Sequence, residues 1–274
     1  MGEEIKCFNG GAPEQTGIGL RLVDCHAHLE ELDEPEAAIE RAGKSGVRSI
    51  VAVGSDRESN RRTLSLSGRH GKVTVHAALG IHPWRLEGRD LEEELAFVER
   101  NLGKAVAVGE VGLDFWLKEV RKDPFRRKRQ EELLRRLLCL GRELSLPLIL
   151  HARGAWEECL RLVLEERISK AVFHWFSGPP ETLQKVLDHG YWISATPAAH
   201  YSEKHRSAIR EAPLERILLE TDSPVLYEGR RSEPADVVRT LQAVARLKQL
   251  PEAEVAEVTT RNALGFFALG EPRG

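Results

Sequence analysis

The chain has 274 residues, 41% of them hydrophobic and 30% charged, with a formal net charge of −3. This length suits a single α/β barrel of about 250 residues, and no apolar run approaches the roughly 18 residues of a membrane-spanning helix, so none is expected. The small negative charge gives no general attraction to nucleic acid, so a polyanion would have to be held by local basic patches or by bound metal.

Residues 1–19 are polar and lack the basic and apolar regions of a secretory signal. We expect them to form a flexible N-terminal extension, followed by one barrel domain over residues 20–270. The four cysteines are scattered without a CxxC pair, which indicates reduced thiols and a cytoplasmic protein. The sequence does not specify the oligomeric state.

Short apolar runs alternate with longer amphipathic stretches along the rest of the chain. The runs predict strands at Leu20–Cys25, Val47–Val53, Val73–Leu79, Ala105–Val108, Leu148–Leu150, Ala171–Phe173, Tyr191–Ala195 and Ile217–Leu219. Apolar residues three and four positions apart predict helices at Glu36–Ser45, Leu91–Leu102, Phe125–Leu144, Trp156–Glu166, Glu181–Asp188 and Ala235–Leu247. Polar residues follow nearly every strand, which favours a (β/α)8 TIM barrel over an open doubly wound sheet with a single switch point.

The first predicted strand leads into the sequence DCHAHLE. Asp24, His26 and His28 alternate there, so on an extended chain they project to one face while Cys25 points away as a buried thiol. Two imidazoles at this spacing can share one metal ion. The alternative is a pair of satisfied polar side chains at a strand end.

Glu110 stands at the end of the fourth predicted strand, within AVGEVGLDF. A carboxylate at this position can bridge two cations, and an unpaired charge beside a buried strand would be costly. The alternative is a surface or helix-capping glutamate. We predict that Glu110 is a metal ligand that takes part in catalysis.

Three further polar residues follow later strands: His151 the fifth, His174 the sixth and Asp222 the eighth. The two histidines indicate a second metal position, as in two-metal hydrolases. Closure of the barrel would bring Asp222 towards the first strand, although an aspartate can also cap a turn or helix. Two carboxylates neutralise only part of the charge of two divalent cations, which leaves attraction for an anionic phosphodiester.

The segments DCHAHLE, ALGIHPW, VGEVGLDF, LPLILHARG, FHWFSG and LLETDSP resemble the successive motifs of the TatD family of metal-dependent deoxyribonucleases. The segment EVTTRNALGFF is similar to the C-terminal helix of that family. The resemblance extends from Leu20 to Leu269. It implies a divalent-metal-dependent hydrolase that cleaves phosphodiester bonds, with DNA as substrate, in single strands or from 3′ ends as a 3′–5′ exonuclease.

The resemblance also implies a role for each matching residue. One metal would be held by His26, His28, Glu110 and Asp222, and the other by Glu110, His151 and His174. His82 would contact the scissile phosphate and Arg153 a phosphate oxygen, although they could instead cap a turn and form a rim salt bridge. This donor set is acceptable to Zn²⁺, Mn²⁺ or Mg²⁺.

These inferences give a mechanistic hypothesis. The two cations would lower the pKa of a shared water from 15.7 towards about 7, and Asp222 would orient that water and take its proton. One alternative is an amidohydrolase-like enzyme acting on a small amide, lactone or ester, many relatives of which bridge their metals with a modified lysine where this chain has Glu110. The other is a metal-binding protein without catalytic activity.

Two departures from the family pattern leave the substrate preference open. Trp175 replaces a smaller residue in the HxFSG motif, and a basic stretch follows Phe115. That stretch, residues 116–129, could guide a nucleic-acid strand or form a solvated helix face. Trp84 and Trp116 could stack on bases or pack on the rim.

Overall fold

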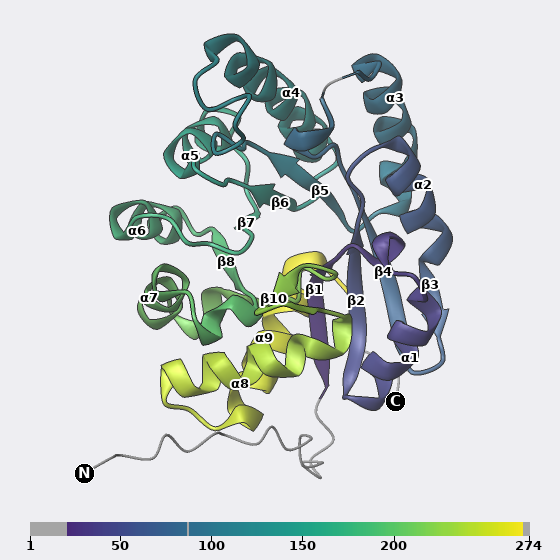
Figure 1. Ribbon diagram of the computed structural model, residues 1–274, viewed down its shortest axis with the longest axis vertical. Helices are drawn as coiled ribbons and strands as arrows, with labels where there is room; N and C mark the ends of the chain where they lie inside the picture. Colours follow the sequence, from purple (N-terminus) through teal and green to yellow (C-terminus); the bar gives the residue numbers. More distant parts are fainter. Residues whose placement is uncertain (1–20, 87, 271–274) are drawn as a thin grey trace, which may run out of the picture.

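The computed structural model describes residues 21–86 and 88–270, and its strands form a ring surrounded by helices (Figure 1). The predicted extension over residues 1–19 lies outside the described residues. The barrel strands are β1 (Leu22–Ala27), β2 (Val47–Val53), β4 (Val73–Leu79), β5 (Ala107–Gly112), β6 (Leu148–His151), β7 (Ala171–Phe173), β8 (Trp192–Ala195) and β9 (Ile217–Leu219). They are hydrogen-bonded in this order, and every pair is parallel. The predicted TIM barrel is confirmed.

The barrel closes between the end of β9 and β1. Asp24 of β1 accepts hydrogen bonds from Thr221, at 2.9 Å from the backbone nitrogen and 2.7 Å from the hydroxyl. The backbone nitrogen of Asp222 donates to the carbonyl of His26 over 2.9 Å. The Asp24 carboxylate thus joins the first and last barrel strands.

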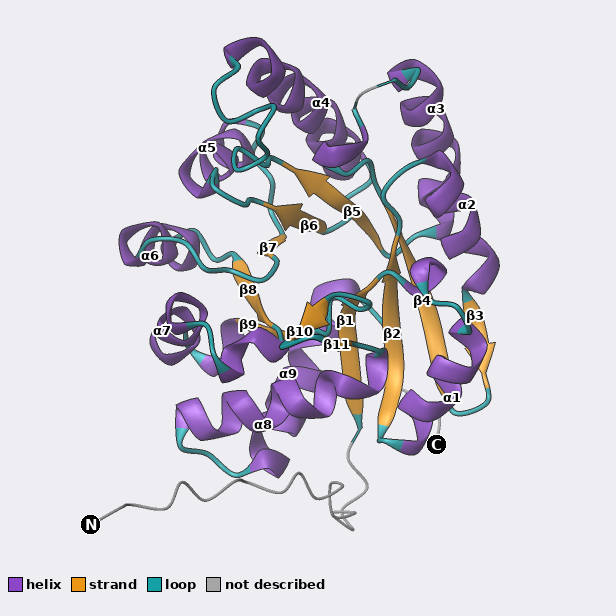
Figure 2. Ribbon diagram, in the orientation of Figure 1, coloured by secondary structure: helices purple, strands orange, loops and turns teal. Residues whose placement is uncertain are grey.

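Helices fill the connections between strands (Figure 2). They are α1 (Pro35–Lys44), α2 (Arg57–Leu66), α3 (Leu91–Asn101), α4 (Pro124–Glu143), α5 (Trp156–Glu165), α6 (Pro180–Asp188), α7 (Glu203–Glu211), α8 (Val237–Lys248) and α9 (Glu252–Phe267). Short 3-10 turns occur at Leu29–Glu31, Pro83–Arg85, Leu102–Lys104, Pro197–His200, Leu214–Arg216 and Pro234–Asp236. The smaller strands are β3 (Gly68–His70), antiparallel to β4, and the hairpin of β10 (Leu226–Tyr227) and β11 (Arg230–Arg231). None of the helices among the described residues is long and apolar enough to cross a bilayer.

The predicted helices begin and end within two residues of α1, α3, α4, α5, α6 and α8. Two helices were not predicted, and in both the buried side is partly polar. The inner face of α2 carries Ser59, Asn60 and Thr63, and that of α7 carries His205. Apolar periodicity is therefore weak in both segments, although each packs against the barrel.

Buried apolar side chains form two layers. One layer lies between the strands and the surrounding helices. The other combines single side chains from most barrel strands with residues of α9, and contains Val23, Cys25, Val51, Val53, Ala78, Ala107, Ile149, Val172, Leu218, Ala263, Phe266 and Phe267. Helix α9 contacts both β1 and β9, so it packs on the barrel interior where the ring closes. Cys25 is buried as predicted, and it lies in this inner layer together with Val23, which has the same direction on the alternating strand.

The packing of α9 on the barrel interior leads to a prediction about stability. Phe266 is 1% exposed and belongs to the inner layer. Phe266→Ala should lower the free energy of unfolding by about 3–5 kcal/mol, because it removes buried apolar area and leaves a cavity. Phe125→Ala, at a phenylalanine that is 69% exposed, is the control and should change it by less than about 0.5 kcal/mol. Equal effects of the two changes in urea unfolding would contradict this account of α9.

Candidate metal centre

The residues predicted as metal ligands converge at one end of the barrel. They come from β1, β5 and β6 and from the segments that follow β1, β7 and β9: His26, His28, Glu110, His151, His174 and Asp222. Most of these side chains are buried, and the most exposed, that of His28, is 13% exposed. Glu110 lies at their centre, because each of its two carboxylate oxygens faces a different group of imidazole nitrogens.

The first group surrounds Oε2 of Glu110. His26 Nε2 and His28 Nε2 each lie 3.4 Å from this oxygen and 3.2 Å from each other. Asp222 Oδ1 lies 3.5 Å from His26 Nε2 and 3.6 Å from His28 Nε2. Four donors on a tetrahedral metal with bonds of about 2.0–2.1 Å are themselves about 3.3–3.4 Å apart. His26, His28 and Glu110 therefore have the spacing needed to hold one ion, and Asp222 Oδ1 lies beside both histidines.

The second group surrounds Oε1 of Glu110. His151 Nδ1 lies 2.8 Å from this oxygen, His174 Nε2 lies 3.0 Å from it, and His82 Nε2 lies 3.4 Å from it. Imidazole and carboxylate are common donors to Zn²⁺ and to other divalent transition metals. This group could hold a second ion, so Glu110 is placed to contribute one oxygen to each.

Two buried carboxylates behind the centre fix the histidines of the second group. Asp114 Oδ2 lies 3.0 Å from His151 Nε2, and Glu220 Oε1 lies 3.2 Å from His174 Nδ1. A carboxylate at one ring nitrogen accepts a hydrogen bond from the N–H group there. The lone pair of the other ring nitrogen is then available to a metal. The sequence analysis assigned no role to either carboxylate, although both follow strands in the motifs VGLDF and LLETD.

The electrostatics of the centre favour bound cations. Burial alone would lower the pKa of His28, but Glu110, Glu30 and Asp222 raise it to about 10. Burial alone would raise the pKa of Asp114, but hydrogen bonds from His151 and Trp84 lower it to about 2. The carboxylates that favour a protonated imidazole can equally be neutralised by a divalent ion. Binding of that ion releases the proton from the imidazole.

Comparison with known proteins agrees with this geometry. The profile of the family described as TatD related DNase matches residues 23–268. The chain belongs to the TatD family. Curated relatives include deoxyribonuclease TATDN3 of Homo sapiens, 31% identical over 91% of this chain and 95% of the relative. The metal-dependent hydrolase YabD of Bacillus subtilis is 32% identical over 90% of this chain and 99% of the relative.

Solved structures show the same relationship. The TatD homologue YjjV of Escherichia coli superposes with a TM-score of 0.83 at 28% identity, covering 92% of this chain and all of that chain. The predicted family, barrel and class of metal-dependent hydrolase are therefore confirmed. The roles of individual side chains in this TatD-family protein stay predictions.

His82 caps a turn, which was one of the two predictions for it, and its contact with the scissile phosphate stays a prediction. Its Nδ1 accepts a hydrogen bond from the backbone nitrogen of Trp84 over 3.2 Å, as a cap of the 3-10 turn Pro83–Arg85. Burial lowers the pKa of His82 to about 4, so the ring is neutral at pH 7 and carries its proton on Nε2. That proton faces Oε1 of Glu110, so His82 would not be a ligand of the second ion in this state.

Arg153 forms the predicted rim ion pair and still has free donors. Its Nε donates to Asp114 Oδ2 over 2.7 Å, and the guanidinium carbon lies 5.1 Å from the ring centre of Trp84. Among the described residues no acceptor contacts the two Nη groups. They can therefore meet a phosphate at the barrel mouth.

Two glycines allow the backbone to approach closely around Glu110. A Cβ atom on Gly112, where φ is +152°, would lie 1.9 Å from the carbonyl oxygen of His151. A Cβ atom on Gly80 would lie 2.5 Å from the carbonyl oxygen of Glu110. Side chains at these positions would push β4 and β6 away from β5, which carries Glu110.

The position of Asp114 predicts an effect on metal affinity. Asp114→Asn should weaken the binding of Zn²⁺ or Mn²⁺ about 10- to 100-fold, because His151 loses the charged partner that orients it and makes it a better donor. Isothermal titration calorimetry measures this change. Glu119→Gln, at an exposed carboxylate in the same loop, is the matched control. Equal affinities of the Asp114 variant and the unmodified protein would show that Asp114 does not support the metal.

Proposed function

We propose that this TatD-family protein is a two-metal deoxyribonuclease that hydrolyses single strands or 3′ ends as a 3′–5′ exonuclease. The observation that carries the proposal is that Glu110 presents its two oxygens to two separate groups of nitrogens. In this proposal one ion is held by His26, His28, Glu110 and Asp222, and the other by Glu110, His151 and His174.

Two divalent ions in these positions would lower the pKa of a water molecule and offset the charge that develops on the phosphoryl oxygens. Asp222 directs Oδ1 at His26 and His28, which leaves Oδ2 to orient the attacking water and accept its proton.

The remaining polar groups of the mouth would bind the substrate phosphate. The Nε2 proton of His82 and the Nη groups of Arg153 can donate to phosphate oxygens, and Asp114 holds Arg153 in place. The ligand carboxylates, Glu110 and Asp222, offset only half of the charge of two divalent ions. The loaded centre would therefore attract an anion such as a phosphodiester.

The depth of the centre supports action on strand ends. The proposed ligands are at most 13% exposed, and a single strand or a strand end can enter a narrow mouth more easily than a continuous duplex. The human relative is named a deoxyribonuclease, which favours DNA as the polymer. These points also favour the nuclease over an enzyme acting on small amides or lactones.

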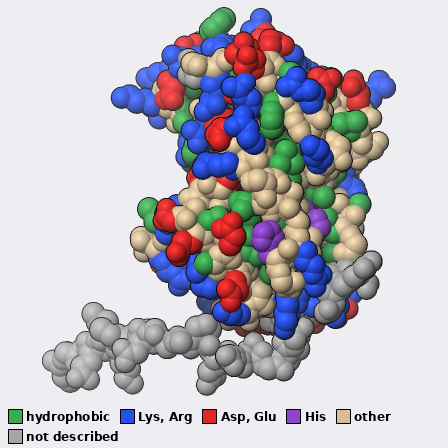
Figure 3. All heavy atoms as spheres, turned by 90° about the vertical axis from the view of Figure 1, so that its right-hand side faces the viewer, with side chains coloured by type: hydrophobic (Ala, Val, Ile, Leu, Met, Phe, Trp, Pro, Cys, Tyr) green, Lys and Arg blue, Asp and Glu red, His purple; other side chains and the backbone are tan. Residues whose placement is uncertain are grey.

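Local charge offers a path for the DNA strand. Lys118, Arg121 and Lys122 are exposed and form no ion pair within the described part of the chain, and they lie between β5 and α4. Elsewhere charges of both signs are mixed: on the face around α2 and α3, Lys and Arg side chains alternate with Asp and Glu (Figure 3). The loop after β5 is thus a better candidate for strand contact than the surface as a whole.

The nitrogen-rich donor set favours Zn²⁺ or Mn²⁺, with Mg²⁺ as the third candidate. We also propose a reducing, cytoplasmic location. Cys25, Cys139 and Cys159 are all free thiols, which is the usual state in that compartment.

The proposed base gives the test of this function. Asp222→Asn keeps the size of the side chain and removes its negative charge, so it should retain the fold and lower DNA cleavage by about 10²–10⁴-fold. Cleavage of labelled single-stranded DNA with Mn²⁺ measures the change. Asp33→Asn, at an exposed carboxylate, is the control.

Duplex DNA, RNA and a panel of amides and lactones, each with and without EDTA, complete this test. Single-stranded DNA or 3′ ends should be cleaved fastest, and EDTA should abolish the cleavage. Substantial activity of the Asp222 variant would exclude its role as the base. Metal-dependent turnover confined to amides or lactones would overturn the proposed function.

A further inference from the structure

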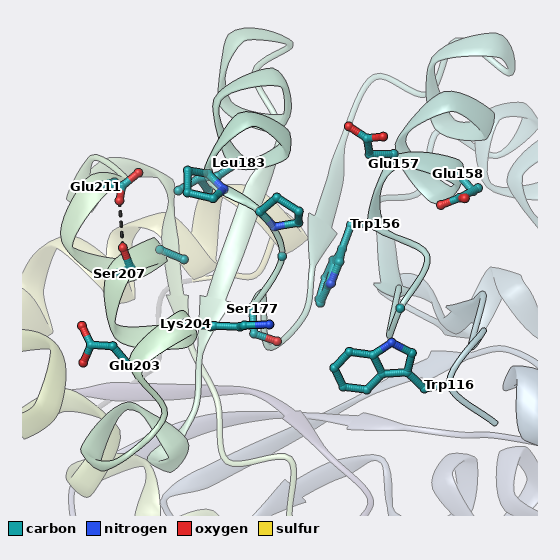
Figure 4. A pocket seen from close by; sticks show the side chains of 15 residues that line it. Trp116, Trp156, Glu157, Glu158, Ser177, Leu183, Glu203, Lys204, Ser207 and Glu211 are labelled. Atoms are coloured by element: carbon teal, nitrogen blue, oxygen red, sulfur yellow. Dashed lines mark hydrogen bonds between the residues drawn. The ribbon is translucent and has the colours of Figure 1, made fainter. Parts of the chain in front are cut away.

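A groove of about 640 Å³ opens between α5, α6 and α7 (Figure 4). This volume lies within the range of about 300–1,000 Å³ that is usual for sites binding small ligands. Trp116 and Trp156 form one side of the groove, and Ser177 and Lys204 lie across from them (Figure 4). None of these residues belongs to the metal centre described above.

The two indole rings pack closely against glycines. A Cβ atom on Gly154 would lie 2.1 Å from Cδ1 of Trp116, and Gly154 has a φ of +70° that other residues rarely adopt. A Cβ atom on Gly178 would lie 2.8 Å from Cγ of Trp156. Each indole thus packs against a residue that has no side chain. Trp116 is nevertheless 60% exposed, so much of its surface is open to a ligand.

The groove and the metal centre are linked through the side chain of Asp114. The backbone nitrogen of Trp116 donates to Asp114 Oδ1 over 3.0 Å, and the other oxygen of Asp114 contacts both His151 and Arg153. Ser177 is three residues beyond His174, a stretch that spans at most about 11 Å. A strand whose phosphate lies at the metals can therefore place a neighbouring nucleotide in the groove.

The lining of the groove has more carboxylates than basic groups, so a nucleotide would be held there mainly by stacking on the indoles, with Lys204 as the single basic contact. Lys204 is the basic residue among those that line the groove, and it forms no ion pair within the described residues. It extends from α7 into the groove (Figure 4), and the Ser177 hydroxyl adds a donor on that side. Three of the four lining carboxylates already have partners: Glu157 with Lys185, Glu203 with Arg210, and Glu211 with Ser207.

We propose that the groove binds an unpaired nucleobase of the DNA strand, in the nucleotide next to the scissile phosphate. The base stacks on the indoles of Trp116 and Trp156. Its phosphate lies near Lys204 and Ser177. The inference rests on the proposed deoxyribonuclease function and adds to it a preference for unpaired ends, because a base within a duplex cannot enter the groove.

Stacking of this kind predicts a loss of affinity at one nucleotide position. Base–aromatic stacking strengthens binding by roughly 5- to 100-fold per base. We would measure the affinity of the metal-loaded protein for single-stranded oligonucleotides with phosphorothioate linkages, which resist cleavage. In this series each position near the 3′ end is replaced in turn by an abasic residue. Removal of the base at one position should give the full loss of affinity, and removal at the other positions should change the affinity little.

The Trp116→Ala variant identifies where that base lies. Trp116→Ala should lower the affinity for the intact oligonucleotide as much as removal of the critical base lowers the affinity of the unmodified protein. Combining the two changes should cause no further loss of affinity. Equilibrium dialysis with Mn²⁺ checks that the metal centre of this variant is intact. Phe125→Ala, at an exposed aromatic residue outside the groove, should leave affinity unchanged.

The inference is overturned if no abasic position weakens binding, or if the abasic and Trp116 changes weaken it independently. The proposed function fails in a different way, by the absence of phosphodiester hydrolysis in the unmodified protein. The binding measurement does not depend on hydrolysis, so the two failures are distinguishable.

Discussion

The carboxylate of Glu110 is the constraint on which the rest of the centre depends. It is 2% exposed, and a buried charge of this kind must be neutralised by its surroundings. Imidazole nitrogens from β1 and the segment after it, from β6 and from the segment after β7 surround its two oxygens at 2.8–3.4 Å. A site that gathers so many donors around one buried carboxylate is best explained by cations that the carboxylate shares.

The barrel brings these donors together from distant parts of the sequence. Parallel strands place their carboxyl ends at one rim, and the hydrogen bonds between Asp24 and Thr221 bring the end of β9 against β1. This closure places Asp222 beside His26 and His28. Asp222 has a φ of 49°, a left-handed conformation that aspartate tolerates better than most residues, and its backbone nitrogen is bound to the carbonyl of His26. The same contacts that close the fold thus complete the centre.

Much of this arrangement could be predicted from the sequence, because each donor follows or ends an apolar run. The bounds of β5 were less accurate: the strand was predicted at Ala105–Val108 but runs from Ala107 to Gly112 and includes Glu110, because glycines and a carboxylate interrupt the apolar pattern there. Asp114 and Glu220 could not be assigned, because the direction of a side chain just beyond a strand depends on the fold of the loop. The groove was beyond prediction for a similar reason. Trp116 was considered as a stacking residue, but it lies in the loop after β5 whereas Trp156 begins α5, and only tertiary packing brings the two indoles to one cavity.

The central claim is that Glu110 serves two ions at once, and the stoichiometry of bound Mn²⁺ in equilibrium dialysis tests it most directly. The unmodified protein should bind two ions per chain. In Glu110→Gln the affinity should fall at both positions together, because the amide has lost the negative charge that both ions use. A single ion in the unmodified protein, or a variant that keeps one position at its original affinity, would contradict the shared carboxylate.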